Sequence, residues 1–132
     1  MSRSLIQTVS AGPQTVAELG TISLGTTTRR FGCNLALSGD AIECSGPGYY
    51  TVTASLVVAP TAAGVISVEL YKNGAPVTGA ISTTTVAAAN DPASLSIVGT
   101  VRLGCCETGT LTLVLTEGAG SVENVAVRVE KA

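Results

Sequence analysis

The residues of this chain that could do chemistry are four cysteines and nine scattered carboxylates, with no histidine among the 132 residues. Without histidine the sequence lacks the commonest general base, the Ser-His-Asp and Cys-His constellations and most kinds of zinc site. Glu43 and Glu69 fall on predicted strands, but no two acids are spaced as an acid–base pair. We therefore predict no catalytic residues, no enzymatic activity and no cofactor.

The cysteines are Cys33, Cys44, Cys105 and Cys106, a spacing that contains no CxxC pair. A predicted hairpin would bring Cys33 and Cys44 near each other, whereas a bridge between the vicinal pair would be strained. Three interpretations stay open, in this order: free buried thiols, a disulfide from the hairpin to the loop around Cys105, and a metal site. A four-cysteine metal cluster is disfavoured because adjacent residues of a strand point apart. No basic neighbour is present to lower a thiol pKa for redox chemistry.

The elements that must position the cysteines and carboxylates are organised around two long predicted strands within residues 48–74. From Tyr50 to Val58 apolar side chains alternate with Thr and Ser, which is the period of a half-buried strand. Pro60 cannot donate to a ladder and is predicted to end this strand. A second alternating strand, with its inner face at Ile66, Val68 and Leu70, leads to the tight-turn pair Asn73-Gly74.

The rest of the chain predicts more strands and no helix of useful length. We expect strands at 4–10, 94–103, 110–117 and 121–131, with a polar loop at 25–30. A strand over 31–37, which contains Cys33, should form a hairpin with 41–44. The total is roughly eight to ten strands in an all-β sandwich or jelly roll. We expect one domain over 1–132, with 1–30 as an N-terminal arm and first strands and 31–132 as the main sandwich.

Composition limits the partners. Hydrophobic residues make up 45% of the chain but aromatics only 3%, so the core must be aliphatic. Charged residues are only 12%, which suits a surface that is partly buried in an oligomer. The sequence has no basic patch, so we do not expect nucleic-acid binding. No apolar run reaches membrane-spanning length, and the opening MSRSLIQTVS lacks a signal-peptide segment. We expect synthesis in a reducing cytoplasm, with exit by lysis, assembly or a non-standard route.

Several segments together resemble the C1q/TNF-like jelly roll in its bacterial and phage form. The G-x-Y-x-V strand of that family is matched by Gly48, Tyr50 and Val52, and the next strand ends in Lys72-Asn73-Gly74. A last strand of alternating valines closes the domain, so this resemblance covers residues 31–132. The whole chain also resembles small proteins of gut Firmicutes and their prophages, through MSRSLIQT, RRFGCN and the vicinal cysteines.

The resemblance implies a homotrimer of ten-stranded jelly rolls on a phage particle, as a fibre, decoration or receptor-binding protein, or on a bacterial surface. The expected function is thus a non-enzymatic structural and adhesion module, located on the virion or at the cell surface. Its partners would be further copies of itself and another virion or surface protein or a glycan. The alternatives are a spore-surface protein, a secreted TNF-like ligand and a sugar-binding jelly roll. A cupin-like enzyme would need a histidine-rich motif that this chain lacks.

Two sets of surface residues follow from these expectations. Apolar side chains at outward strand positions predict a trimer interface at Val65, Tyr71, Val98 and Val114. By resemblance, the sheet that holds Tyr71 should face the threefold axis and bury this side chain between subunits. Tyr49 is the aromatic residue best placed to face outward toward a ligand.

Overall fold

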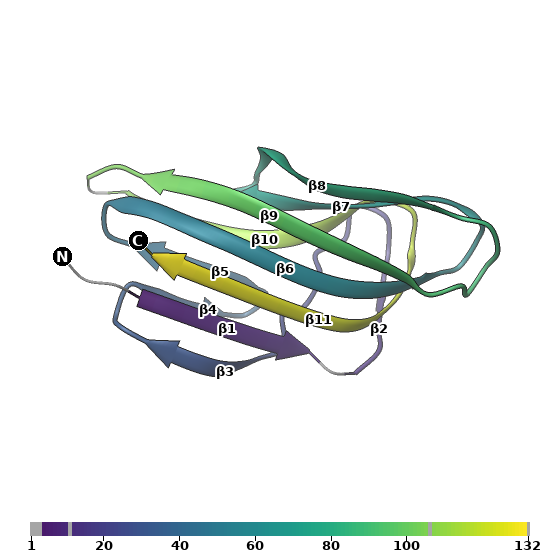
Figure 1. The fold of residues 1–132 in the computed structure, drawn as a ribbon, viewed down its shortest axis with the longest axis horizontal. Coiled ribbons are helices and arrows are strands. Elements are labelled where there is room, and N and C mark those ends of the chain that lie inside the picture. Colours follow the sequence, from purple (N-terminus) through teal and green to yellow (C-terminus); the bar gives the residue numbers. More distant parts are fainter. Residues whose placement is uncertain (1–3, 11, 106, 132) are drawn as a thin grey trace.

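Two antiparallel sheets packed face to face form the molecule, as Figure 1 shows. The computed structural model describes residues 4–10, 12–105 and 107–131. Among these residues none forms a helix of the length and apolarity needed to cross a membrane. The strands are β1 (Ser4–Ser10), β2 (Gln14–Val16), β3 (Thr26–Phe31), β4 (Leu35–Ser38), β5 (Ala41–Ser45), β6 (Gly48–Pro60), β7 (Gly64–Lys72), β8 (Ala75–Val86), β9 (Ala93–Leu103), β10 (Thr108–Glu117) and β11 (Gly120–Lys131).

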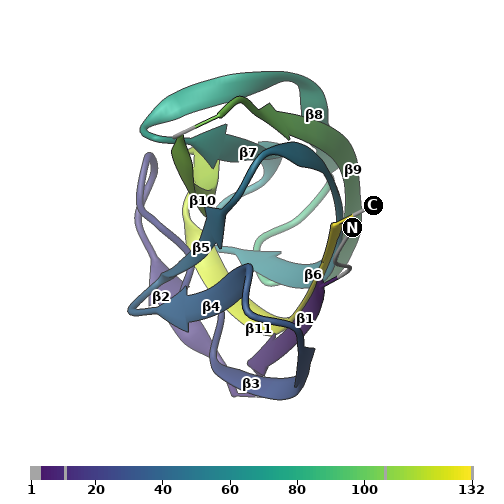
Figure 2. The same cartoon turned by 90° about the vertical axis from the view of Figure 1, so that its left-hand side faces the viewer.

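The strands divide between sheet A, in the order β3-β1-β11-β6-β9 with β2 also beside β11, and sheet B, in the order β4-β5-β10-β7-β8. The end-on view in Figure 2 shows the two layers, and the buried side chains lie between them. β6 lies inside sheet A and pairs with both β11 and β9 over most of its length. The predicted all-β sandwich is confirmed.

The core is built from the inward positions of the long strands. Along β6 every second side chain is buried, from Tyr50 to Val58, in agreement with the predicted alternation. Ile66, Val68 and Leu70 of β7 face this row from sheet B. Aliphatic side chains fill nearly all of the interior, and β9 carries Gly99 where it meets Ala80 of β8.

The described part of residues 1–30 belongs to the sandwich rather than to a separate arm. β1 lies between β3 and β11, and β2 continues along the same side of β11. The chain then crosses to sheet B, where Thr21 bridges Val114 and Ile22 is fully buried. The side-chain amide of Gln14 fixes this crossing by donating to the Ser23 carbonyl and accepting from the Ser23 N–H, each at 2.9 Å.

The predicted elements around Cys33 are wrong. The loop expected at 25–30 forms most of β3, which continues to Phe31, and the rest of the strand expected over 31–37 is a bend at 32–34 followed by β4. All six side chains of β3 are exposed, so this strand has no apolar alternation that could reveal it. It exists because its backbone pairs with β1, for instance Phe31 with Leu5. Cys33 therefore lies in a bend.

Tyr50 connects the core to the turn that precedes β6. Its ring is fully buried, and its hydroxyl lies 2.7 Å from the carbonyl oxygen of Ser45 and 2.9 Å from that of Gly46. The hydroxyl has one hydrogen, so the two carbonyls share it. Burial, and secondarily the nearby Cys44 thiol, raise the pKa of Tyr50. The neutral hydroxyl thus holds the chain reversal between β5 and β6.

Removing this hydroxyl should weaken the fold without opening a cavity. We expect Tyr50→Phe to lower the free energy of unfolding by about 1–2 kcal/mol, because the Gly46 carbonyl loses the Tyr50 donor and the Ser45 carbonyl keeps only the side-chain N–H of Asn34. Urea unfolding followed by circular dichroism measures the change. Tyr49→Phe is the matched control, since the side chain of Tyr49 is exposed. Equal stability of Tyr50→Phe and the wild type would contradict the assigned role.

Candidate functional site

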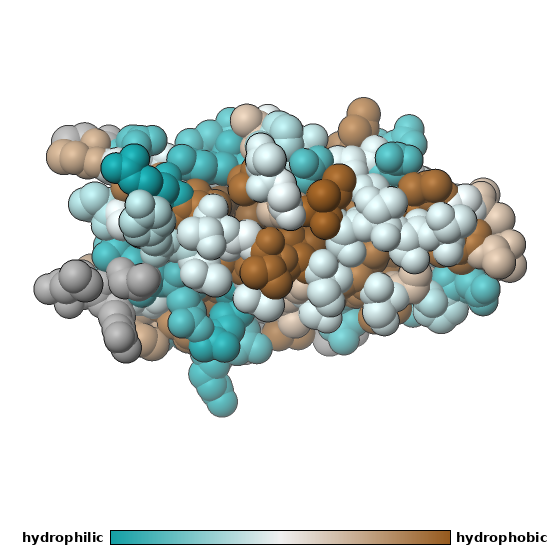
Figure 3. All heavy atoms as spheres, turned by 45° about the horizontal axis from the view of Figure 1, so that its top comes forward, coloured by the Kyte–Doolittle hydropathy of each residue, from teal (hydrophilic) through white to brown (hydrophobic). Residues whose placement is uncertain are grey.

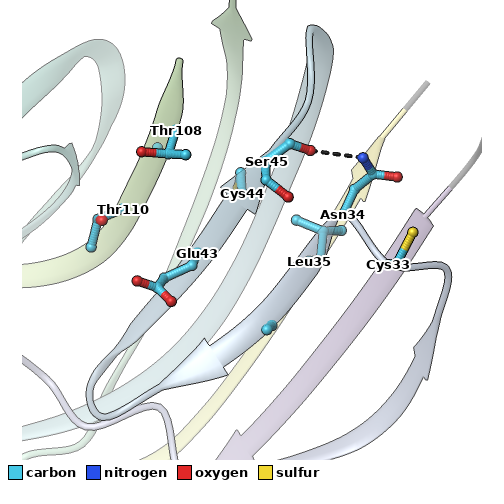
Figure 4. A pocket seen from close by; sticks show the side chains of 10 residues that line it. Cys33, Asn34, Leu35, Glu43, Cys44, Ser45, Thr108 and Thr110 are labelled. Atoms are coloured by element: carbon cyan, nitrogen blue, oxygen red, sulfur yellow. Dashed lines mark hydrogen bonds between the residues drawn. The ribbon is translucent and has the colours of Figure 1, made fainter. Parts of the chain in front are cut away.

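A shallow pocket of about 240 Å³ lies on sheet B, where β4, β5 and the start of β10 run side by side (Figure 4). The strand register places Ala36, Glu43 and Thr110 in one row across the three strands. Ser45 and Thr108 face each other in the next row. These outward residues alternate with Cys44 of β5, which is 1% exposed and points into the core.

Hydrogen bonds to backbone atoms hold the walls of this pocket. The side-chain N–H of Asn34 donates to the Ser45 carbonyl at 2.7 Å, drawn as the dashed line in Figure 4. Across the pocket, the side-chain oxygen of Asn73 accepts from the Thr110 N–H at 2.8 Å. The side-chain N–H of the same asparagine lies 3.4 Å from the Thr108 carbonyl. These bonds hold β5 and β10 through main-chain atoms, so the outward side chains of the two strands remain available to contact a ligand.

The cysteines lie toward one end of the sandwich but not together. Cys44 is a buried free thiol, while Cys33 is a free thiol exposed at the rim of the pocket. Cys105 is exposed and follows β9, which forms one edge of sheet A, whereas Cys33 follows β3, which forms the opposite edge. Cys106 lies outside the described residues. Within those residues no group of three His, Cys, Asp or Glu side chains could hold a metal ion.

Burial makes Cys44 a weak acid. It raises the pKa of the thiol to about 12, although the Lys72 ammonium acts in the opposite direction. Lys72 is itself held at the end of sheet B by donating to the Arg102 carbonyl at 3.0 Å. Because a thiolate is the nucleophile in cysteine chemistry, Cys44 is inert at neutral pH.

This pKa predicts a loss of stability in alkali. An unfolded thiol ionises at about 8.5, so between that pH and 12 the unfolded chain binds fewer protons than the folded one. The free energy of unfolding should therefore fall by about 1.4 kcal/mol per pH unit above pH 9 from this thiol. Urea titrations from pH 7 to 10 measure the slope. Cys44→Ala should lose it and Cys33→Ala should retain it; identical slopes in both variants would contradict the prediction.

The four residues predicted for a trimer interface occupy two opposite surfaces. Val65 and Tyr71 lie on β7 and Val114 on β10, all on the outer face of sheet B. Val98 lies on β9 in sheet A, pairs with Thr53, and is 66% exposed. Val65 is 42% exposed, and Tyr71 and Val114 are half-buried. One flat interface therefore cannot contain all four side chains.

The other predicted residues are also separate from the pocket, with one exception. Tyr49, 57% exposed, lies opposite Arg102 on the outer face of sheet A, and Glu69 lies on β7. Of these three residues Glu43 lines the pocket, together with Thr108 and Thr110 of the neighbouring strand. The sequence did not reveal these two threonines as neighbours, because their pairing with β5 joins segments more than 60 positions apart.

Comparisons with known proteins identify the architecture. No family model and no curated protein matches the sequence. Murine APRIL at pH 5.0 superposes with a TM-score of 0.79, at 12% identity, over 99% of this chain and 100% of that chain. The globular domain of zebrafish complement 1qA gives a TM-score of 0.68, at 9% identity, over 96% and 94%. The fold is a TNF/C1q-like jelly roll.

This TNF/C1q-like jelly roll confirms the fold that the strand motifs predicted. The described residues form eleven strands rather than the ten implied, since β2 is an extra piece of three residues. The vertex protein P5 of phage PRD1 shares the TNF/C1q-like architecture, with a TM-score of 0.56 at 14% identity over 97% of this chain and 95% of that chain. At such low identities these likenesses establish a common fold and nothing finer.

Proposed function

We propose that this protein is a non-enzymatic structural and adhesion module that assembles as a homotrimer on a phage particle or a bacterial surface. The same jelly roll occurs in a phage vertex protein and in the globular domain of complement 1qA. The observation that carries the proposal is a charge-free surface on sheet A. Its residues lie on the outward positions of two paired strands: Thr51, Thr53, Ser55 and Val57 of β6, and Ser94, Ser96, Val98 and Thr100 of β9.

This surface, which we call the β6–β9 face, has the properties of a buried contact. Its side chains are small or β-branched, and Val98 is the most exposed large apolar residue on any described strand. In Figure 3 the middle of the molecule is mostly pale or brown, and the strongly hydrophilic side chains lie mainly at the left end and along the upper and lower margins. Association that covers such a face removes apolar area from water without desolvating a charge.

The outer face of sheet B is less suited to the same role. Glu69 lies on it between Val65 and Tyr71, and it has no ion-pair partner within the described residues. Burying an unpaired carboxylate at an interface costs several kcal/mol, roughly as much as a large apolar contact contributes. We therefore assign the threefold contact to Val98 and leave Val65, Tyr71 and Val114 outside it.

The site chemistry also favours binding over catalysis. Glu43 lines the pocket without a second acid or any histidine beside it. A lone carboxylate at the surface of a sheet can accept hydrogen bonds, but it has no partner to complete an acid–base mechanism. The pocket is thus better interpreted as a recognition feature.

A pair of charge insertions on opposite sheets tests the assembly. We expect Val98→Glu to convert a trimer into a folded monomer at micromolar concentration, since a charge would be desolvated at each contact. Tyr71→Glu on sheet B should stay trimeric. Sedimentation velocity measures both, with circular dichroism to confirm folding. A monomeric wild type would refute the trimer, and dissociation by Tyr71→Glu alone would move the interface to sheet B.

The location is tested separately. The resemblance to proteins of Firmicutes prophages implies that the protein is a prophage-encoded virion component. Mass spectrometry should then find it in purified particles after prophage induction, at a copy number that is a multiple of three. Recovery from spore or cell surfaces and absence from particles would favour the bacterial-surface alternative. Recovery only from the cytoplasm would contradict both.

A further inference from the structure

The pocket around Glu43 contains polar side chains that the fold does not use. Within the described residues, the Glu43 carboxylate and the hydroxyls of Ser45, Thr108 and Thr110 make no hydrogen bond or ion pair. The bonds at this place involve the main chain of β5 and β10, through Asn34 and Asn73. One carboxylate and three hydroxyls are therefore held on rigid strands and face outward together.

The pocket stays open in the proposed assembly. It lies on sheet B, whereas the β6–β9 face lies on the opposite layer of the sandwich. Its floor includes Ala36, which lies beside Glu43 in the outward row, and a larger side chain at this position would fill the space. A ligand could therefore approach each subunit from the outside of a trimer.

The donor and acceptor pattern identifies the class of ligand. Sugar hydroxyls both donate and accept, as do the hydroxyls of Ser45, Thr108 and Thr110, and a carboxylate can accept from two adjacent hydroxyls at once. Divalent cations prefer several carboxylates or carbonyls, and no group of three acidic, His or Cys ligands exists within the described residues. The volume is below the range of about 300–1,000 Å³ usual for drug-sized ligands, so it suits one small ring.

We propose that this pocket binds a single ring of a saccharide, with Glu43 accepting from two neighbouring hydroxyls and Thr110 completing the contact. The inference deepens the proposed adhesion function, because it names a glycan as the substance to which the module adheres. Each subunit of a trimer would contribute one weak site, and three sites on one particle would bind a glycan-coated surface by avidity.

The experiment uses the full chain and defined probes. Methyl glycosides of glucose, galactose, mannose, rhamnose and N-acetylglucosamine are titrated by calorimetry, after a glycan array has selected among them. We expect at least one to bind, and Glu43→Gln and Thr110→Val each to weaken it by about tenfold or more. The controls, Glu123→Gln on β11 and Thr85→Val on β8, remove the same groups at exposed positions away from the pocket and should bind normally.

Cys33 supplies an independent readout, since its free thiol is exposed at the rim of the pocket. A bound sugar should slow the alkylation of Cys33 by a maleimide while Cys105 reacts at an unchanged rate, as peptide mass spectrometry can resolve. The inference would be overturned if no probe bound or if Glu43→Gln bound with unchanged affinity. It would also be overturned if the cationic probe n-butylamine bound and no glycoside did. A monomeric wild type that still binds a glycoside would refute the trimer alone, and a virion trimer without sugar binding would refute this site alone.

Discussion

Leu70→Ala should lower the free energy of unfolding by about 4–5 kcal/mol, near the upper end of the range for such a truncation. Leu70 is 2% exposed and packs across the core against β9. At the point of contact β9 has Gly99, and a methyl group added to this glycine would lie only 3.4 Å from a terminal carbon of Leu70. Because glycine has no side chain, the residue of β9 that faces Leu70 cannot fill the space that Leu70 vacates. The cavity would persist, and its cost would remove a large part of a typical domain's stability of about 5–15 kcal/mol.

The control for Leu70→Ala is Ile81→Ala on the neighbouring β8. Ile81 is 48% exposed on the outside of the same sheet, so its truncation should cost less than about 1 kcal/mol. Both variants are unfolded in urea at one protein concentration, because an oligomer gains apparent stability by mass action. Similar losses in the two variants would show that the core does not depend on Leu70 in the way described.

The long strands could be predicted because period-two patterns are local. From Tyr50 to Val58 each buried residue is separated by one exposed or half-exposed residue, and β10 and β11 follow the same rule around Leu113 and Val127. The turn at Asn73-Gly74 is also local, and Asn73 has the positive φ of 53° that such a turn requires. These patterns, with the motifs at Gly48 and Lys72, were sufficient to predict a β-sandwich.

The assignment of strands to sheets could not be predicted in the same way. Val65 and Val98 both read as apolar residues on the outside of a strand, but β7 pairs with β8 and β10 while β9 pairs with β6. Pairing of this kind is long-range, so the sequence does not show whether two outward faces are on the same layer. The Glu43 pocket was missed for the same reason, since β5 and β10 meet only in the folded chain.

β3 shows a different limit of prediction from sequence, and the residue before it gives the second substitution with a large expected effect on stability. Its side chains are all exposed, so its position depends on backbone pairing with β1 and on the conformation of the residue that precedes it. This residue is Gly25, with a φ of +80°, and it is packed so closely that a Cβ there would overlap the carbonyl oxygen of Val9. Val9 cannot retreat, because its main chain pairs with Thr26 on one side and Ala126 on the other.

We therefore expect Gly25→Ala to lower the free energy of unfolding by about 2–5 kcal/mol, the sum of left-handed strain and overpacking. Gly39→Ala separates the two causes, since Gly39 also has a positive φ, +59°, but a Cβ there would meet nothing within 4 Å. It should cost only about 1–2 kcal/mol. Hydrogen exchange should also show faster exchange of β1 and β3 amides in Gly25→Ala, because the two strands must separate to admit the methyl group. If both glycines cost the same, the contact with Val9 yields freely, and the first and third strands are held together by something other than this close approach.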